Sequence, residues 1–244
     1  FSEEGAEEVS NGSFSQEGSE LVTNGSFDTD SDWTKGTGWS ISGGTANCDG
    51  TQTSSSDITQ GLTTQSGKSY KITYTISEYT SGSIFVRLNS GNTTTSQSSV
   101  GTFTEYLSGE NGTQISLRAS ADFIGSIDNV SVREVGQDWT LNTGWSIGED
   151  KAVAVTGAGS KLIQTNTLNG KTCKVTLTVS DYGGTSLILV DFGSTSSSYI
   201  TSNGTHTVYG TYDQDNFEIY KASGFSGSIT NISVKEVGQN WDLG

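Results

Sequence analysis

The stretch GSIDNVSVREVGQDWTLNTGWSI, Gly125 to Ile147, decides how this chain is organised. Its first part returns near the C-terminus as GSITNISVKEVGQNW, Gly227 to Trp241, with 11 of 15 positions identical. Its second part, DWTLNTGWSI, echoes DWTKGTGWSI at residues 32–41. The tryptophans of the three DW or NW pairs are therefore 106 and 102 residues apart. Since solenoid repeats have about 20–50 residues, a period of this length indicates whole domains in tandem.

The module boundaries follow from these repeats. EEVSNGSF (Glu7–Phe14) is a near copy of ELVTNGSF (Glu20–Phe27), and the residues around the first copy are rich in Glu, Gly and Ser. We interpret the first copy as part of a linker or of the tail of an upstream repeat, and the chain as a portion of something longer. The predicted segments are residues 1–20 (linker or tail), 21–135 (module one), 136–237 (module two) and 238–244 (start of a truncated third repeat).

The composition favours short strands and excludes two classes of partner. Hydrophobic residues make up only 31% of the chain, yet aromatic residues reach 9%, which a disordered chain would lack. Aromatic, Thr, Val and Ile residues favour strands. The net charge of −15 argues against a nucleic-acid backbone or an anionic membrane as partner. No stretch approaches the roughly 18 apolar residues that a membrane-spanning helix needs.

Two matching stretches, KSYKITYTIS (Lys68–Ser77) and KTCKVTLTVS (Lys171–Ser180), alternate strictly between apolar and polar residues. Alternation with one polar face is typical of a sheet that packs on one side. No segment shows helical periodicity, and turn residues separate the strands at intervals of about 8–12 residues. We therefore predict an all-β fold with two tandem β-sandwich, jelly-roll domains. The residues expected to face the cores are Tyr70, Ile72, Tyr74, Ile76, Cys173, Val175, Leu177 and Val179.

The repeated motifs resemble a known family. LVTNGSFD followed by a Trp, a central strand ending in Tyr, and a closing IDNVSV resembles carbohydrate-binding modules with the galactose-binding-like jelly-roll fold. More narrowly, NGSFDTDSDWTKGTGWSISGG (Asn24–Gly44) looks like the tandem modules of bacteriophage tail-fibre and virion appendage proteins. The likeness covers residues 21–237. It implies a place on the virion exterior or outside the cell, with a glycan or host polysaccharide and other virion proteins as partners.

The sequence offers little for catalysis. Its one histidine, His206, has Phe103 as its counterpart in the first repeat. GWSIG (Gly144–Gly148) matches the nucleophile-elbow pattern, but that motif needs a strand–turn–helix context and here lies in a β pattern. We therefore predict that the chain is not an enzyme.

Acidic residues indicate one candidate metal site. Asp28, Asp30 and Asp32 have alternating spacing, but a Trp follows where an EF-hand needs Gly. Family members often carry a structural calcium, held in part by an acid after the N-G-x-F motif and an Asp in the closing strand. The resemblance assigns these roles to Asp28 and Asp128, and Thr230 replaces Asp128 in module two. It thus implies structural Ca²⁺ in module one, with solvated acidic turns as the alternative.

Loop-end tyrosines are the predicted ligand contacts. Tyr79 and Tyr182 each follow an acid at a strand end and precede Gly- and Ser-rich residues. Sugar binding uses aromatic faces with a few polar groups that fix orientation. Phe85 and Arg87 lie on the non-core face of the following strand, where Asp191 matches Arg87. If this face binds sugar, the exchange of Arg for Asp predicts that the two modules differ in specificity.

Three classes of function stay open. The first is a non-catalytic bacteriophage virion structural protein, a tail fibre or exterior appendage that faces a receptor or glycan. The second is the ancillary carbohydrate-binding pair of a secreted polysaccharide-degrading enzyme. The third is a bacterial surface adhesin or filament with the modules as spacers. We favour the first, because tandem domains with short linkers suit reach, and arrays convert weak contacts into avidity. Whether the chain forms homo-oligomers stays open.

Overall fold

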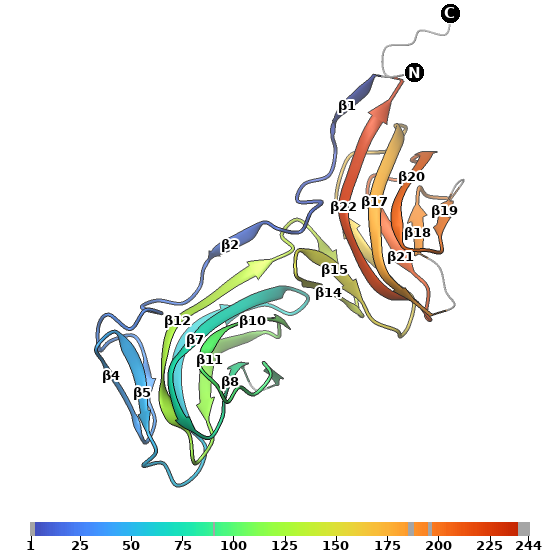
Figure 1. The fold of residues 1–244 in the computed structure, drawn as a ribbon. Helices are drawn as coiled ribbons and strands as arrows, with labels where there is room; N and C mark the ends of the chain where they lie inside the picture. The colour runs from blue at the N-terminus through green and yellow to red at the C-terminus, as the bar shows by residue number, and fades with distance from the viewer. Residues whose placement is uncertain (1–2, 90, 185–187, 195–196, 239–244) are drawn as a thin grey trace, which may run out of the picture. The chain divides into compact units, whose positions relative to one another are not determined.

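The computed structural model describes residues 3–89, 91–184, 188–194 and 197–238, and within them every regular element is a β-strand. The predicted all-β class is confirmed, and the strands pair into four antiparallel sheets (Figure 1). The chain divides into two compact units. We call residues Glu17–Val135 the N-unit, and residues Phe1–Gln16 together with Gly136–Gly244 the C-unit.

The N-unit contains a larger and a smaller sheet. The larger has the strand order β10-β7-β12-β5-β4, and β2 also pairs with β12. The smaller has the order β3-β6-β11-β8-β9. The strands are β2 Glu17–Glu20, β3 Thr34–Lys35, β4 Trp39–Ser42, β5 Thr45–Asp49, β6 Ser56–Thr64, β7 Ser69–Ser81, β8 Ile84–Leu88, β9 Asn92–Thr93, β10 Gly101–Ser108, β11 Gly112–Ala119 and β12 Ile124–Val135.

The C-unit repeats this arrangement strand for strand. Its larger sheet has the order β20-β17-β22-β15-β14, with β1 also paired to β22, and its smaller sheet has the order β13-β16-β21-β18-β19. The strands are β1 Glu4–Glu7, β13 Thr140–Leu141, β14 Trp145–Gly148, β15 Lys151–Ala154, β16 Ser160–Gln164, β17 Thr172–Gly183, β18 Ile188–Asp191, β19 Ser197–Ile200, β20 Gly204–Thr211, β21 Phe217–Lys221 and β22 Ser226–Val237.

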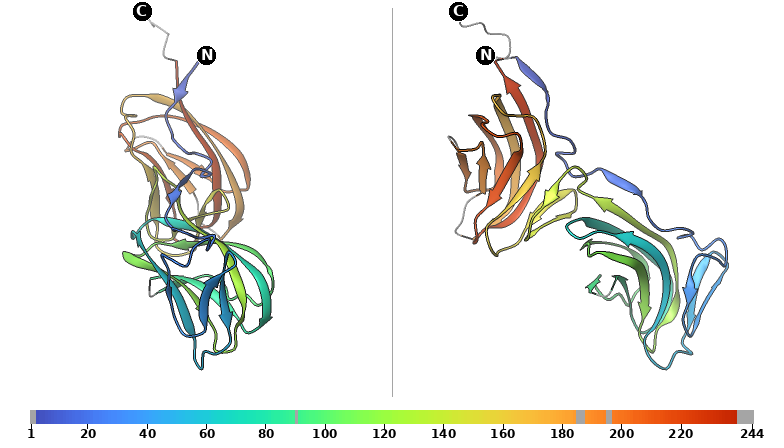
Figure 2. Two further views of the ribbon diagram at one scale, coloured as in Figure 1. Left: turned by 90° about the vertical axis from the view of Figure 1, so that its left-hand side faces the viewer. Right: turned by 180° about the vertical axis from the view of Figure 1, so that it is seen from behind.

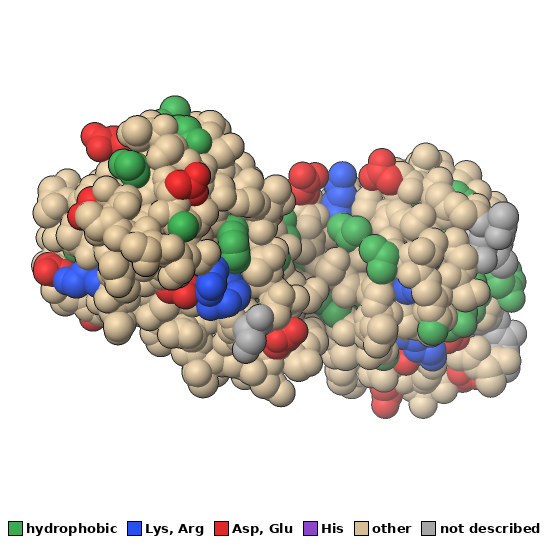
Figure 3. Space-filling view, turned by 90° about the horizontal axis from the view of Figure 1, so that it is seen from below, with side chains coloured by type: hydrophobic (Ala, Val, Ile, Leu, Met, Phe, Trp, Pro, Cys, Tyr) green, Lys and Arg blue, Asp and Glu red, His purple; other side chains and the backbone are tan. Residues whose placement is uncertain are grey.

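Each core lies between the two sheets of its unit, because alternate residues of every long strand point inward. In the N-unit one buried cluster joins side chains of both sheets, such as Ile72 of β7 and Leu117 of β11. All eight residues predicted to face the cores are buried, including Cys173, which is a free thiol. On the face shown in Figure 3, most of the surface is neither charged nor hydrophobic side chain. Among the described residues no helix is long and apolar enough to cross a bilayer.

The first 16 residues belong to the C-unit, which differs from the predicted linker or tail over residues 1–20. β1 pairs with β22 with Glu4 opposite Val237, just as β2 pairs with β12 with Glu17 opposite Val135. The two short strands follow one another along the chain but serve different units (Figure 2). The C-unit is therefore built from two stretches of chain that the whole N-unit separates.

Candidate functional site

Each unit is completed by an 11-residue segment that we call its clasp. The clasp of the C-unit is EGAEEVSNGSF, Glu4–Phe14, and that of the N-unit is EGSELVTNGSF, Glu17–Phe27. The two are identical at 8 of 11 positions and follow one another with only Ser15 and Gln16 between them. Most of the clasp contacts described below occur in both units.

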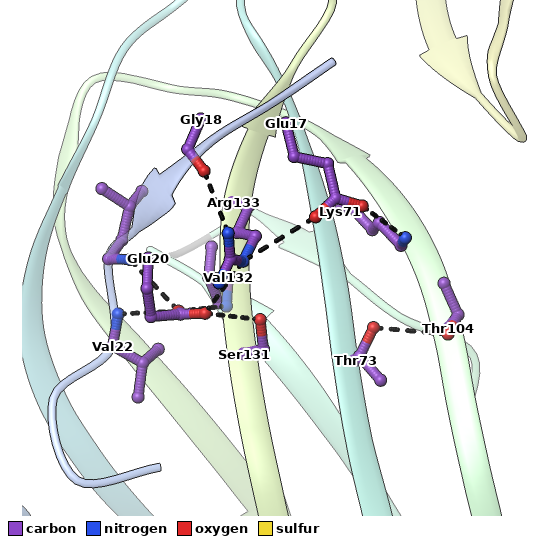
Figure 4. Close-up of polar contacts among 11 residues, drawn as sticks. Glu17, Gly18, Glu20, Val22, Lys71, Thr73, Thr104, Ser131, Val132 and Arg133 are labelled. Carbon is purple, nitrogen blue, oxygen red and sulfur yellow. Dashed lines mark hydrogen bonds and ion pairs between the residues drawn. The ribbon is translucent and has the colours of Figure 1, made fainter. Parts of the chain in front are cut away.

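A glutamate at the end of the short strand holds the closing strand of the N-unit. The Glu20 carboxylate accepts a hydrogen bond from the backbone N–H of Val132 at 2.8 Å and from the Ser131 hydroxyl at 2.6 Å (Figure 4). Burial raises the pKa of Glu20, but these bonds, that from the Val22 N–H and the nearby Arg133 together bring the pKa below its usual value. The ionised carboxylate is thus the form that the fold stabilises.

The C-unit repeats this arrangement with its own clasp. The Glu7 carboxylate accepts from the backbone N–H of Val234 and the hydroxyl of Ser233, both at 2.6 Å. The Glu8 N–H donates to the Val234 carbonyl at 2.8 Å. These bonds join residues more than 220 positions apart in the sequence.

In the N-unit the Asn-Gly-Ser-Phe turn inserts an aromatic ring. Asn24 and Phe27 have left-handed φ values of 50° and 52°. The Val130 N–H donates to the Gly25 carbonyl at 2.9 Å, and a Cβ on Gly25 would lie 2.0 Å from the Val130 oxygen. Phe27 is buried with its ring centroid 5.2 Å from that of Trp33, whose indole N–H donates to the Asn24 carbonyl at 3.1 Å. Only glycine permits this close approach.

The C-unit contains the same turn. Asn11 and Phe14 have φ values of 48° and 58°, and a Cβ on Gly12 would lie 1.9 Å from the Ile232 oxygen. Phe14 is fully buried with its ring centroid 5.1 Å from that of Trp139. The Trp139 indole donates to the Asn11 carbonyl at 3.1 Å.

A buried glutamine of the smaller sheet binds the clasp backbone in each unit. The Gln60 side-chain amide accepts from the Thr23 N–H at 2.8 Å and donates to the Thr23 carbonyl at 2.7 Å. Gln164 makes the same pair of bonds to Ser10, at 2.8 and 2.9 Å. This recognition is independent of the bound side chain, because it reads the peptide group alone.

The clasp borders a polar surface on the larger sheet, which we call the outer face: the solvent side of β7 and β10 in the N-unit, and of β17 and β20 in the C-unit. Lys71 pairs with Glu17 of the clasp at 2.6 Å and lies opposite Tyr106. Lys174 pairs with Glu4 at 2.6 Å and lies opposite Tyr209, which is 62% exposed. Each lysine therefore joins the clasp to the outer face.

Threonine pairs continue the outer face beyond each lysine. In the N-unit the hydroxyls of Thr73 and Thr104 are 3.3 Å apart, and those of Thr75 and Thr102 are 2.9 Å apart (Figure 4 shows the first pair). In the C-unit the same register positions hold threonine again, and one of these pairs is bonded at 3.1 Å. The C-unit pairs are Thr176 with Thr207 and Thr178 with Thr205. Thus both units present one pattern: Lys opposite Tyr, then two rows of threonines that face one another across the strands.

The predicted ligand tyrosines pack at the ends of the cores instead of standing free. Tyr79 is half-buried, its hydroxyl donates to the Gly82 carbonyl at 3.1 Å, and its ring lies 6.5 Å from that of Phe123. Tyr182 is also half-buried, 5.4 Å from Phe225 between ring centroids. These contacts favour a role in closing the turn after the long strand.

Phe85, Arg87 and Asp191 lie on the smaller sheets, so the structure does not bring them onto the same sheet as the tyrosines. The Arg87 guanidinium forms an ion pair with the Asp57 carboxylate at 3.7 Å. In the C-unit Lys161 is 3.3 Å from Asp191 and also pairs with a second acid of the same sheet. The hydrogen bond to that acid, helped by Asp191, raises the pKa of Lys161.

The two predicted calcium ligands are engaged in local turns. Asp28 accepts the Ser26 hydroxyl at 2.7 Å, and Asp128 accepts the backbone and side-chain N–H groups of Asn129 at 2.6 and 3.0 Å. Among the described residues no three Asp, Glu, His or Cys side chains gather as a metal site. Calcium binding by Asp28 and Asp128 stays a prediction.

The candidate catalytic motifs are also placed by the fold. Ser146 of the GWSIG motif lies within strand β14, which pairs with β15, so it is not on a strand-to-helix turn. A His206 ring nitrogen is 2.9 Å from the Ser202 carbonyl oxygen.

No model of a known protein family matches the sequence, and no curated protein matches it significantly. The resemblance to carbohydrate-binding modules therefore rests on the motifs quoted above. The clasp is the feature that sequence reasoning missed. Its signal was present: two consecutive copies of one segment precede two modules, one copy for each.

Proposed function

We propose that this chain is a non-catalytic structural protein of a bacteriophage particle, a tail fibre or exterior appendage, whose outer faces bind a host surface glycan. The observation that carries the proposal is the outer face itself. It repeats in both units the same lysine, tyrosine and threonine positions on the solvent side of the larger sheet.

The chemistry of this face suits a polyhydroxylated ligand. Threonine hydroxyls both donate and accept hydrogen bonds, and the lysine ammonium donates three. An exposed ring such as Tyr209 offers a flat apolar surface for a sugar ring, with a polar hydroxyl at its edge. Neighbouring strands lie about 4.8 Å apart, which sets a regular hydroxyl spacing across the face.

Two equal faces on one chain support binding through avidity. Linked weak sites gain overall affinity without any new contact when a repetitive polymer engages both. This proposal replaces the predicted difference in specificity between modules, because the outer faces match where Arg87 and Asp191 differ. The net charge of −15 favours solubility and opposes non-specific adhesion to anionic surfaces.

Glycan binding is tested on the intact chain with host capsular and cell-wall polysaccharides immobilised on a sensor surface. Tyr209→Ala is expected to weaken binding roughly tenfold, the loss of one aromatic contact of about 1–1.5 kcal/mol. Tyr199→Ala is the matched control, because Tyr199 is 65% exposed but lies on β19 of the smaller sheet. Equal weakening by both substitutions contradicts the outer face as the site.

The place of the protein is tested separately by mass spectrometry of purified phage particles. Finding the chain in the particle supports the virion proposal. Finding it secreted from cells beside a glycoside hydrolase domain favours the ancillary module of an enzyme, and finding it on a bacterial surface favours an adhesin.

A further inference from the structure

The smaller sheet of the N-unit carries a hollow of about 340 Å³ beside the end of β8 and the start of β11. Its lining combines one guanidinium with amides and a hydroxyl: the residues are Arg87, Asn89, Asn111, Gly112, Thr113 and Gln114. None of them lies on the strands of the outer face. Ligand pockets have volumes of roughly 300–1,000 Å³, so this hollow suits a small polar group.

Arg87 enters this hollow without a hydrogen-bond acceptor. Its ion pair with Asp57 has an N–O distance of 3.7 Å, which is too long for a hydrogen bond, and its Nε is buried without a partner. Within the described part of the chain, Arg118 and Arg133 donate at 3.1 and 3.3 Å, whereas Arg87 donates no hydrogen bond. An unsatisfied donor on a charged group is costly. The guanidinium therefore lacks an acceptor, and the hollow that it lines is where one can enter.

The charges around the hollow favour an anion. Oδ2 of Asp57 is 3.1 Å from a nitrogen of Arg118 and 3.7 Å from one of Arg87, so one carboxylate serves two guanidinium groups. Two positive charges and one negative charge leave one positive charge uncompensated. Neither Asp57 nor the exposed Glu110 lines the hollow. An anion bound there meets a locally positive surface on a chain whose net charge is −15.

Amide groups beside the guanidinium are suited to binding hydroxyls. The Asn89 side chain is held in place, because it donates to the Thr64 hydroxyl at 2.8 Å and accepts from the Gln114 N–H at 3.2 Å. Oδ1 of Asn111 accepts from the Ser66 N–H at 3.0 Å, which leaves the Asn111 amide nitrogen as a donor. The lining thus offers fixed polar groups for a ligand that carries hydroxyls as well as a negative charge.

The C-unit has the reverse charges at the matching positions. Asp191 occupies the place of Arg87, and Lys161 that of Asp57. Lys161 pairs with both Asp191 and Glu218, so one positive charge serves two negative charges. This surface repels an anion. The outer faces match, so the difference in specificity between the units lies on the smaller sheets.

We propose that the hollow beside Arg87 binds a sugar residue that carries a carboxylate, as part of an acidic polysaccharide. The planar guanidinium binds carboxylates through two parallel hydrogen bonds, and the neighbouring amides bind the ring hydroxyls. The inference rests on the proposed function only in that the ligand is a glycan. Its site is separate from the outer face, and its ligand is defined by charge.

The site is tested by isothermal titration calorimetry of the intact chain with tetragalacturonate, which carries a carboxylate on each ring. The fully methyl-esterified form is the matched neutral ligand. It is expected to bind at least about tenfold more weakly, because it loses the charge-assisted hydrogen bonds. Acetate and inorganic phosphate are titrated alone, and both are expected to bind more weakly than tetragalacturonate because they lack the ring hydroxyls.

Two substitutions assign the binding to Arg87. Arg87→Gln should weaken tetragalacturonate binding about tenfold or more, and Arg87→Lys should weaken it less, since lysine keeps the charge but not the planar fork. Lys35→Gln is the matched control, because it removes one positive charge from β3 of the same sheet. It should change the Kd less than about twofold, since distant exposed charges are screened. In NMR spectra the Arg87 Nε–H signal should shift on binding.

Three results would overturn the proposal. The first is equal affinity for tetragalacturonate and its methyl ester. The second is equal weakening by Arg87→Gln and Lys35→Gln, or an Arg87 Nε–H signal that does not move. The third is binding of acetate or phosphate as tight as that of tetragalacturonate, which would make this a site for any small anion. Each result leaves the outer face untouched, because that site is tested through Tyr209→Ala, so the two proposals fail separately.

Discussion

The N-unit and the C-unit hold their clasps with equivalent contacts, yet the tryptophan contact is local in one unit and distant in the other. The hydrogen bond from the Trp33 indole to Asn24 spans 9 positions, whereas the equivalent bond from Trp139 to Asn11 spans 128. Local contacts form quickly and distant ones slowly, because loop closure costs entropy before any contact rewards it. The comparison teaches that equivalent contacts can be made by a neighbouring segment or by one more than 100 positions away in the chain.

The largest effect is expected from removing the buried clasp ring. Phe14→Ala should destabilise the C-unit by about 3–5 kcal/mol, since it leaves a cavity beside Trp139 in a fully buried site. Phe27→Ala should cost the N-unit a similar amount. Hydrogen exchange resolved by peptide measures each unit separately. Loss of protection in residues 17–135 on Phe14→Ala would break the assignment of clasps to units.

A smaller effect is expected from adding a single methyl group to the turn. Gly12→Ala and Gly25→Ala place a Cβ about 2 Å from a backbone carbonyl oxygen, so the turn must shift. Overpacking of this kind costs roughly 1–3 kcal/mol. Thermal unfolding followed by tryptophan fluorescence checks the change. Gly43→Ala is the control for loss of glycine, since its Cβ meets nothing within 4 Å although its φ of 66° is strained.

A difference in pH dependence should separate the units. The C-unit buries Lys221 where the N-unit has Ala119, and the ammonium donates to the carbonyls of Val155 and Ala158. Burial lowers the pKa of Lys221 below 10.5. Between the lowered folded value and the unfolded value the unfolded chain binds more protons, so this group makes stability rise with pH.

Lys221→Met should remove that rise in the C-unit and leave the N-unit unchanged. Chemical denaturation at several pH values between 8 and about 10 measures it, below the usual lysine pKa. An unchanged slope in the variant would show that Lys221 does not titrate with folding.

The smallest effect is expected at the clasp carboxylate of the N-unit. Because the pKa of Glu20 is lowered in the folded state, its contribution is present above the usual value of 4.5 and is lost as pH falls through the lowered value. Glu20→Gln should cost about 1 kcal/mol at neutral pH and reduce the acid sensitivity of the N-unit. Acid titration of unit-resolved hydrogen exchange checks this, with the C-unit as internal reference.

The strands and cores could be predicted from the sequence because alternation is a local signal. Tyr70, Ile72, Tyr74 and Ile76 are all within 2% of full burial, as their period of two requires. The clasp could not be assigned in the same way. EEVSNGSF and ELVTNGSF are near copies, so the sequence alone does not assign each to a groove, and the three-dimensional path of the chain does.

The surroundings of Tyr79 depend on a change of register that the sequence does not show. The sequence places Tyr79 at the end of a strand; in the structure β7 continues to Ser81, and its pairing with β12 shifts register near this end. A bulge of this kind redirects side chains relative to simple alternation, and it brings Tyr79 against Phe123. The outer face was harder to see, because threonine and lysine on a strand look like ordinary solvated positions until cross-strand partners are known.

The pairing of Glu4 with Val237 has a mechanical consequence. The two ends of the described chain leave the C-unit as neighbours on adjacent antiparallel strands, so tension applied to them peels β1 from β22. Peeling breaks hydrogen bonds one at a time, each worth about 0.5–1.5 kcal/mol net, whereas shear would load the whole ladder at once. The clasp of the C-unit is therefore expected to detach under tension before the sandwich of the C-unit unfolds.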